Sequence, residues 1–139
     1  MNTSIKDCQI ITLNRHHSDR QGDLSVVENM ENVPFKVKRI YYLYDIPGGA
    51  TRGGHAHKNL YQLLIAASGS FTIVLDDGTH RQNVTLNQPD QALLIVPGIW
   101  RELENFSSGA ICLCLASETY TESDYIRDYS TFIKQPSSN

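Results

Sequence analysis

Two histidines stand one residue apart in the stretch RGGHAHKNLYQ, which covers residues 52–62. Histidines at this spacing share one face of a strand, because successive side chains in a strand point to opposite sides. Imidazole nitrogens bind metal ions, and an imidazole with an unperturbed pKa near ~6.5 also takes up and returns a proton near neutral pH. His55 and His57 are therefore candidates either for a metal site or for acid–base catalysis.

The spacing around these histidines continues on both sides. Counted from Gly49, the chain reads G-x5-H-x-H-x4-Q-x6-G and completes this pattern at Gly69. The pattern resembles the first motif of the cupin superfamily at every spacing, with Gln62 where metal-binding cupins have Glu. A later stretch, DQALLIVPGIWRELEN, resembles the second cupin motif, and Arg101 stands where that motif has its third histidine. The resemblance implies a small jelly-roll β-barrel.

These substitutions decide which chemistry the histidines favour. A metal-dependent cupin holds its ion with three imidazoles and one carboxylate, and two of those four positions differ here. Gln62 is a neutral amide, and Arg101 carries a fixed positive charge and has no lone pair to donate. We therefore expect no functional metal and no cofactor, although two imidazoles alone can still capture copper or nickel in vitro.

The four motif residues suit proton transfer instead. His55, His57, Gln62 and Arg101 would face one barrel interior, and a guanidinium holds an oxyanion or a phosphate. This set suits the removal of a proton next to a carbonyl, with stabilisation of the enolate. Simpler interpretations stay open, since Arg101 could pair with a nearby acid and Gln62 could satisfy backbone groups in the core.

The elements that must hold these residues are short strands. Runs rich in β-branched and aromatic residues recur at intervals of ~8–12 residues, which is typical of an all-β sandwich or barrel. We expect strands at 24–28, 35–46, 60–68, 71–75, 83–86, 91–97, 101–106 and 110–117. Asp77 and Gly78 predict a tight hairpin turn. The sequence predicts one all-β domain over residues 1–139, a single-domain cupin.

The segment 122–134 is the part that could carry a helical turn or two. Tyr125, Tyr129 and Phe132 fall on one face at helical spacing, and we expect them to pack against the sheet. Trp100 should point away from Arg101 and pack in a core or dimer contact. Residues 135–139 are expected to form a frayed end.

Composition narrows the classes of function. The chain has 40% hydrophobic and 19% charged residues, and its net charge of −3 argues against a nucleic-acid-binding protein. No apolar run approaches the ~20 residues that span a bilayer, and the first residues do not read as a signal peptide. Cys8, Cys112 and Cys114 form no disulfide framework, so we expect a cytoplasmic protein in which the last two are buried thiols.

Longer stretches narrow the resemblance to one group of cupins. These are DRQGDLSVVE, VPFKVKRIYYLYDIPGGATRGGHAHK, PGIWRELENFS and DYIRDY. They are similar to the dTDP-4-keto-6-deoxy-D-glucose 3,4-ketoisomerases, the sugar 3,4-ketoisomerase cupins, and the similarity runs from Asp19 to Phe132. The resemblance implies that a dTDP-linked 4-keto-6-deoxyhexose is converted into its 3-keto isomer, on the way to 3-amino-3,6-dideoxy sugars of surface glycans.

The resemblance also implies roles for individual residues. It makes His55 the main base and His57 its partner in proton delivery. Tyr41 and Arg52 fall at active-site positions of the family, where they would position the sugar or its diphosphate. Gln62 would contact the pyranose.

Two further positions concern stereochemistry and assembly. Arg101 and Gln21 fall at positions that look toward the sugar in the family and influence which face of C4 is protonated. Arg101 favours the gluco product, whereas Gln21 matches neither of the two patterns. The family also implies a homodimer in which an N-terminal segment, roughly residues 1–33, is exchanged between barrels.

Three rival functions stay open at this point. A nucleotide-sugar epimerase cupin also removes a proton next to a ketone, but it usually pairs a histidine with an aspartate and an opposing tyrosine. A non-catalytic module would bind a sugar or nucleotide sugar without turnover. A degenerate metal cupin, such as a dioxygenase, would hold one tightly bound ion.

Overall fold

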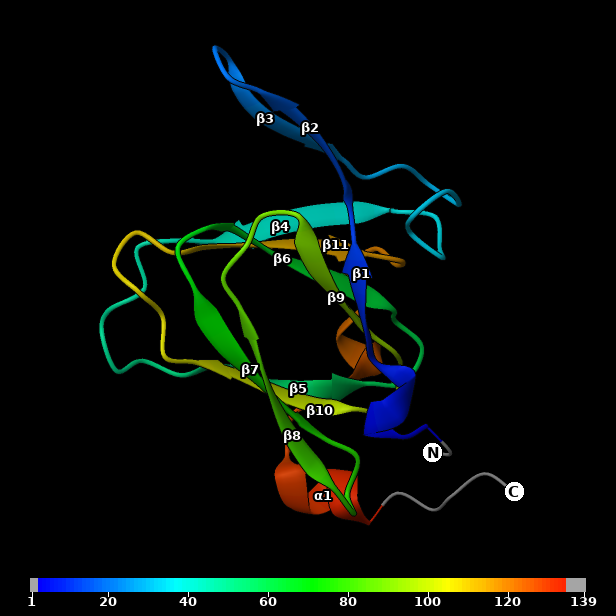
Figure 1. Ribbon diagram of the computed structural model, residues 1–139. Helices are drawn as coiled ribbons and strands as arrows, with labels where there is room; N and C mark the ends of the chain where they lie inside the picture. The colour runs from blue at the N-terminus through cyan, green and yellow to red at the C-terminus, as the bar shows by residue number, and fades with distance from the viewer. Residues whose placement is uncertain (1–2, 135–139) are drawn as a thin grey trace.

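The computed structural model describes residues 3–134, which form two five-stranded sheets, a projecting hairpin and a short helix (Figure 1). The first sheet has the order β1 (Gln9–Thr12), β9 (Gln91–Ile95), β6 (Gln62–Ser68), β11 (Ile111–Ala116), β4 (Arg39–Leu43). The second has the order β12 (Tyr125–Ile126), β5 (Arg52–His57), β10 (Trp100–Glu104), β7 (Phe71–Asp76), β8 (Arg81–Leu86). The remaining elements are β2 (Asn14–Ser18), β3 (Gly22–Val26), α1 (Tyr129–Ile133) and the 3-10 turns η1 (Ile5–Asp7) and η2 (Glu122–Asp124).

The eight strands β4 to β11 follow a jelly-roll path. They are divided between the sheets in the orders β9-β6-β11-β4 and β5-β10-β7-β8, and neighbouring strands in these orders are antiparallel. This is the arrangement of two Greek keys that defines a jelly roll. Within residues 3–134 the sheets face each other without sharing a strand, so the barrel is not a closed ring of hydrogen bonds. The predicted all-β, cupin-like fold is confirmed.

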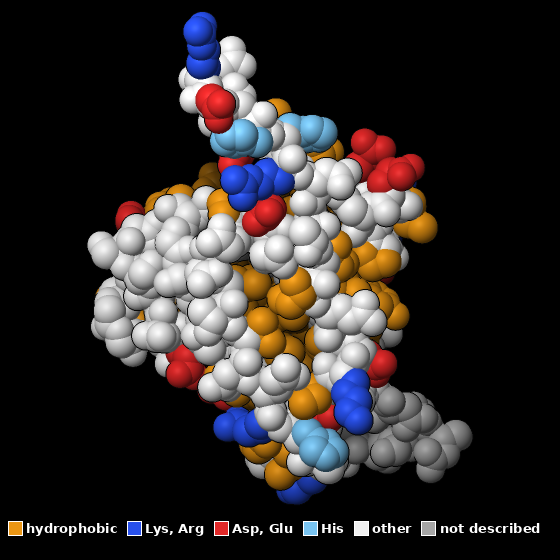
Figure 2. Space-filling model, in the orientation of Figure 1, with side chains coloured by type: hydrophobic (Ala, Val, Ile, Leu, Met, Phe, Trp, Pro, Cys, Tyr) orange, Lys and Arg blue, Asp and Glu red, His pale blue; other side chains and the backbone are white. Residues whose placement is uncertain are grey.

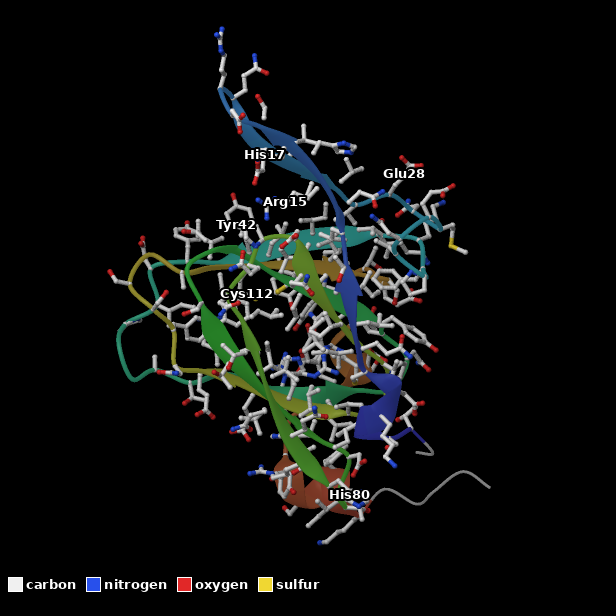
Figure 3. The ribbon with its side chains drawn as sticks, in the orientation of Figure 1. Arg15, His17, Glu28, Tyr42, His80 and Cys112 are labelled. Atoms are coloured by element: carbon white, nitrogen blue, oxygen red, sulfur yellow. The ribbon has the colours of Figure 1, made fainter. Side chains whose placement is uncertain are left out.

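The space between the sheets is apolar on one side and polar on the other. Inward side chains of β7 and β9, among them Ile73, Leu75, Leu93 and Ile95, are almost fully buried in the main core. Each such side chain stabilises the fold by about 1.5–3 kcal/mol when it leaves water. Cys112 lies in the same interior (Figure 3), and the predicted burial of this thiol is confirmed. Polar side chains occupy the part of the interior that lies near β4 and β5.

The hairpin β2–β3 projects away from the two sheets (Figure 1). Its surface carries charged and imidazole side chains (Figure 2), including Arg15 and His17, which both pair with Asp23. The sequence did not predict β1 or β2, and the strand expected at 24–28 lies at 22–26. Polar alternation in an exposed two-stranded ribbon gives little hydrophobic signal, which explains why it was missed.

The strand expected at 35–46 is shorter than predicted. Its regular pairing covers Arg39–Leu43, and the amide of Lys38 donates to the carbonyl of Ala116, the last residue of β11. In the described part of the chain, the ladder between β4 and β11 does not extend beyond these residues. Alternation along β4 turns Tyr41 inward and Tyr42 outward, where Figure 3 shows Tyr42 on the far side of the sheet from the interior.

The helical turn or two expected in the segment 122–134 is confirmed by η2 and α1. Tyr129 and Phe132 pack on the indole of Trp100, at ring-centroid distances of 5.2 and 5.7 Å, which confirms that Trp100 faces away from Arg101. Tyr125 does not belong to this face, because it lies in β12 rather than in a helix. The frayed end expected at 135–139 lies outside the described residues. None of the helices in residues 3–134 is both long and apolar enough to cross a bilayer.

Candidate active site

A cavity of about 340 Å³ opens between the sheets on the side of β4 and β5. Four arginines contribute to its walls, namely Arg39, Arg52, Arg101 and Arg127. The predicted site residues Tyr41, His55 and Gln62 line it as well. Such a concentration of guanidinium groups around one cavity suits an anionic ligand, because Arg binds phosphate oxygens in bidentate fashion.

The two histidines occupy different depths on β5. His55 lines the cavity, whereas His57 is fully buried and is not part of the cavity wall. Their rings meet edge to face with centroids 4.7 Å apart, and the ring of Tyr125 lies 5.1 Å from His55 and 4.3 Å from His57. The predicted common face of His55 and His57 is confirmed, but only His55 can touch a ligand directly.

A glycine makes room for this arrangement. Gly53 has a φ of +77°, and a Cβ there would lie 2.7 Å from Cδ1 of Leu103. The pairing of β5 with β10 shifts register between Arg101 and Leu103, which is the mark of a bulge. Glycine at 53 therefore lets β5 approach β10 closely just before His55.

Gly69, the last glycine of the first cupin motif, also allows two segments of the chain to pack closely. Gly69 has a φ of +67°, and a Cβ there would lie 2.9 Å from the backbone Cα of Ala110 and 2.4 Å from Oγ of Ser107. The turn after β6 thus packs against the loop that leads into β11. This contact explains why the motif has a glycine at position 69.

Arg101 is buried without a carboxylate partner among the described residues. Its Nη1 donates to Oε1 of Gln62 at 2.8 Å, and its Nε and Nη2 donate to the carbonyl of Ile99 at 3.2 and 3.0 Å. Burial lowers the pKa of Arg101 to about 10, so the group stays charged at neutral pH. The interpretation that Arg101 pairs with a neighbouring acid is wrong.

Gln62 connects Arg101 to Tyr41. Its amide nitrogen donates to the hydroxyl oxygen of Tyr41, while its carbonyl oxygen accepts from Arg101. Both polar atoms of the amide are thus used by side chains of the cavity, and the alternative that Gln62 serves backbone groups is not what the structure shows. Burial raises the pKa of Tyr41, so its hydroxyl keeps a hydrogen that it can donate into the cavity.

Both cavity histidines are held neutral. Burial, together with the charges of Arg101 and Arg127, lowers the pKa of His55 to about 2. Burial and the arginines also lower the pKa of His57 to about 3, even though a carboxylate of Asp124 lies at its Nδ1. A neutral imidazole has a free lone pair, so the site has a proton acceptor at neutral pH.

The segment that closes the cavity was not predicted from the sequence. Residues 120–127, called the C-terminal strap below, run past β5 and pair with it through β12. Asp124 accepts a hydrogen bond from Nδ1 of His57, and Arg127 lies over the ring of Tyr125 at 4.1 Å while pairing with Glu122. Only the stretch DYIRDY, quoted for the family resemblance, carried a signal for these residues.

Arg39 is a second residue that the motifs did not reveal. It lies on β4, and its guanidinium is stacked over the rings of Tyr41 and Tyr120. Its Nε and Nη2 are buried and have no hydrogen-bond partner in the described part of the chain. A cation with unused donors on the cavity wall is suited to a negatively charged ligand.

Gln21 is a predicted site residue that lies far from the cavity of its own chain. It lies in the turn between β2 and β3, at the far end of the projecting hairpin (Figure 1). The hairpin holds it away from the two sheets that enclose His55 and Arg101.

The donor set does not form a metal-binding group in the described chain. Within residues 3–134 no three side chains of His, Cys, Asp or Glu gather in a way that could hold an ion. The guanidinium of Arg101 stands across from His55 in the ladder of β10 and β5. The expectation that the protein works without a metal stays a prediction.

Fold and site together define a jelly-roll protein of the cupin type whose cavity combines neutral imidazoles with a ring of guanidinium groups. The chain matches the family described as FdtA: WxcM-like, C-terminal, over residues 6–137, and it belongs to that family.

Related proteins of known activity cover nearly the same length. The TDP-4-oxo-6-deoxy-alpha-D-glucose-3,4-oxoisomerase of Aneurinibacillus thermoaerophilus is 44% identical over 116 residues, which is 84% of each chain. The TDP-quinovose 3,4-ketoisomerase of Campylobacter jejuni is 45% identical, with a TM-score of 0.88 over 94% of this chain and 99% of that one. A mutant of a 3,4-ketoisomerase from Thermoanaerobacterium thermosaccharolyticum, in complex with TDP-4-keto-6-deoxyglucose, is 38% identical, with a TM-score of 0.88 over 91% of each chain.

Proposed function

We propose that this protein is an isomerase that moves the carbonyl group of dTDP-4-keto-6-deoxy-D-glucose from C4 to C3. The observation that carries the proposal is the neutral, cavity-lining imidazole of His55 with the buried guanidinium of Arg101 across from it. The relatives named as 3,4-ketoisomerases support the choice of reaction and of substrate class.

The reaction begins at C3, whose hydrogen is acidified by the adjacent C4 carbonyl. His55 accepts this proton, and the electrons of the broken C–H bond form an enediolate with negative charge on the C4 oxygen. Arg101 stabilises that charge, and the hydroxyl of Tyr41 donates to the sugar in the same region. The intermediate is then protonated at C4 while the C3 hydroxyl loses its proton and becomes the carbonyl, so the product is an isomer of the substrate. His57 acts as the partner of His55 in returning the proton.

The remaining cavity groups hold the nucleotide sugar. The diphosphate is the anionic part of the substrate, and Arg39 and Arg52 on the cavity wall provide donors for it. Gln62 contacts the pyranose ring and stays bonded to Arg101 and Tyr41. No metal or redox cofactor enters these steps.

The product has the gluco configuration in this proposal. Arg101 stands at the position that favours it by family resemblance, and the C. jejuni relative is named for TDP-quinovose, which is a 6-deoxyglucose derivative. In the cell the 3-keto product would be consumed by an aminotransferase that makes a 3-amino-3,6-dideoxy sugar. The free thiols of the chain suit a cytoplasmic location, where disulfides rarely persist.

Incubation with dTDP-4-keto-6-deoxyglucose in D2O, followed by NMR, tests the reaction. The carbonyl signal should move from C4 to C3, and deuterium should appear at C4 of the product. A ketone that is still at C4 after prolonged incubation would show that the protein is not a 3,4-ketoisomerase. The C4 configuration of the product follows from the proton coupling constants of the ring.

One observation favours a second candidate. His57 is hydrogen-bonded to Asp124, and a histidine–aspartate pair is usual in nucleotide-sugar epimerase cupins. An epimerase would exchange the C3 or C5 hydrogen for deuterium and leave the ketone at C4. The same NMR experiment therefore distinguishes the two reactions, and it also distinguishes both from a module that binds without turnover.

The protein acts as a homodimer in this proposal, with residues 1–33 exchanged between subunits. The hairpin extends away from its own sheets and exposes Leu24, and the outer face of β4 exposes Ile40 and Tyr42. A partner subunit would cover these side chains, and Gln21 would then reach the partner's cavity. Analytical ultracentrifugation should give twice the monomer mass, and Leu24→Glu should shift the population toward monomer. Ile133→Glu, at an exposed apolar residue of α1, is the matched control.

A further inference from the structure

The carboxylate of Asp124 is fixed against the deeper histidine. Its Oδ2 lies 3.0 Å from Nδ1 of His57, and its Oδ1 accepts from the backbone N–H of Asn59 at 2.7 Å. The backbone carbonyl of Asp124 accepts from the N–H of Lys58 at 2.9 Å. The next residue of the strap, Tyr125, pairs with His57 in the ladder between β12 and β5. Asp124 and His57 are thus held together by backbone contacts on both sides.

The chemistry of these contacts determines which nitrogen of His57 carries hydrogen. An ionised carboxylate only accepts hydrogen bonds, so Nδ1 must be the protonated nitrogen of the neutral ring. The other nitrogen, Nε2, is then the one with a lone pair. It is buried and has no hydrogen-bond partner in residues 3–134, and the same is true of Nε2 of His55.

We propose that Asp124 is a positioning residue for the isomerisation, which holds His57 in the tautomer with hydrogen on Nδ1 and so keeps its Nε2 available as the proton-accepting nitrogen behind His55. The inference rests on the proposed function for its effect on turnover, but the tautomer itself can be observed without substrate. The side chain of Asp124 is only 11% exposed, so water cannot easily replace the carboxylate as acceptor.

Replacing the carboxylate of Asp124 with an amide should change the tautomer of His57. In Asp124→Asn the single amide oxygen can accept from either Asn59 or His57, and the amide nitrogen, which only donates, then faces the other group. If the oxygen keeps the backbone bond to Asn59, the nitrogen faces Nδ1 of His57, which must then become an acceptor with hydrogen on Nε2. The variant is nearly the same size as the wild type, so it changes the tautomer with little change in shape.

The test combines 15N NMR of histidine-labelled protein with kinetics on dTDP-4-keto-6-deoxyglucose. In the wild type, His57 should show a protonated Nδ1 and an unprotonated Nε2, and in Asp124→Asn the two signals should exchange. The variant's kcat should fall by about 10²-fold or more while KM stays within about twofold, as expected for a loss of acid–base function. Asp128→Asn is the matched control, because Asp128 caps α1 on the surface and does not line the cavity.

Each outcome has a separate meaning. A wild-type His57 with hydrogen on Nε2 overturns the inference, even when Asp124→Asn does not fold. A kcat of Asp124→Asn within about threefold of the wild type also overturns it, since acid–base groups contribute far more than that. A wild-type protein without isomerase activity refutes the proposed function instead, and the NMR signals of His57 still decide whether Asp124 fixes the tautomer.

Discussion

Arg101 and His55 are direct cross-strand partners on β10 and β5, so a fully buried guanidinium stands beside the imidazole that lines the cavity. Side chains at directly opposed positions of an antiparallel pair have Cβ atoms about 4.5–5.5 Å apart. The positive charge of Arg101 contributes to the lowered pKa of His55. In the proposed reaction the same charge would stabilise the enediolate, so one cross-strand pair would serve both the base and the intermediate.

The His55→Asn variant should fold and lose most of its turnover. Asparagine retains a polar group of intermediate size but cannot accept the C3 proton, so kcat should fall by about 10²–10⁴-fold. NMR or a coupled assay for the 3-keto product measures this loss, and circular dichroism checks the fold. His80→Asn is the control, because His80 lies on the exposed β7–β8 turn. Equal activity of His55→Asn and the wild type would remove His55 from the mechanism.

The double variant Gln62→Glu/Arg101→His should bind a divalent metal. It restores a carboxylate and a third imidazole to the set that already contains His55 and His57, and it removes the fixed cation. Elemental analysis of protein purified without an affinity tag should find about one equivalent of zinc, nickel or iron, the number expected for one four-ligand site. The wild type and Gln62→Glu alone, which keeps Arg101, should bind far less. A double variant without metal would contradict the view that these two substitutions prevent metal binding.

Gln62→Ala should destabilise the protein. The substitution leaves Nη1 of Arg101 and the hydroxyl of Tyr41 without their partner, and an unsatisfied buried polar group costs about 1–3 kcal/mol. Urea unfolding at pH 7 gives the loss in the free energy of unfolding. Gln82→Ala on the exposed strand β8 serves as control and should change this free energy by less than about 0.5 kcal/mol.

Stability should fall as the pH is lowered from neutral. The folded-state pKa of His57, about 3, lies below its unfolded value near ~6.5, so the unfolded chain binds more protons between these pH values. The free energy of unfolding should therefore decrease by up to about 1.4 kcal/mol per pH unit from this group as the pH falls below ~6.5. His55, whose pKa is about 2, acts in the same direction.

Urea unfolding at pH 7 and pH 5 measures this slope, in a range above the ordinary pKa values of carboxylates. The His57→Asn variant should show a shallower dependence, because it lacks one of the two buried imidazoles. The exposed His17, whose pKa is raised by Asp23 and Asp19, contributes equally to both proteins and cancels in the comparison. Identical slopes would mean that the pKa of His57 is the same in the folded and the unfolded protein.

The convergence of the motif residues in space follows from local sequence, whereas their functional roles stay a prediction. Motif spacing and strand alternation place His55, Gln62 and Arg101 on inward faces, and the structure brings all three to one cavity with Tyr41 and Arg52. Such predictions succeed because a strand of known register allows only two directions for each side chain. The alternation of side chains does not show where the pairing of a strand stops, so the length of β4 was predicted wrongly.

The rest of the site depends on contacts between distant parts of the chain. Asp124 and His57 are separated by 67 positions, and the strap has no periodicity that would place it over β5. The direction of the β2–β3 hairpin cannot be predicted from the sequence either. An exposed two-stranded ribbon has no hydrophobic face that would show which part of the molecule it packs against. Gln21 was therefore assigned to the site by family resemblance alone.

The strap lies near the C-terminal end of the described chain, after all the strands of the two Greek keys. A ribosome makes the chain from the N-terminus, so β1 to β11 are complete before Asp124, Tyr125 and Arg127 have been added. Until then His57 lacks its carboxylate and the cavity lacks one of its four guanidinium groups. In the proposed reaction the site is therefore complete only after β12, the last strand in the sequence, has been translated.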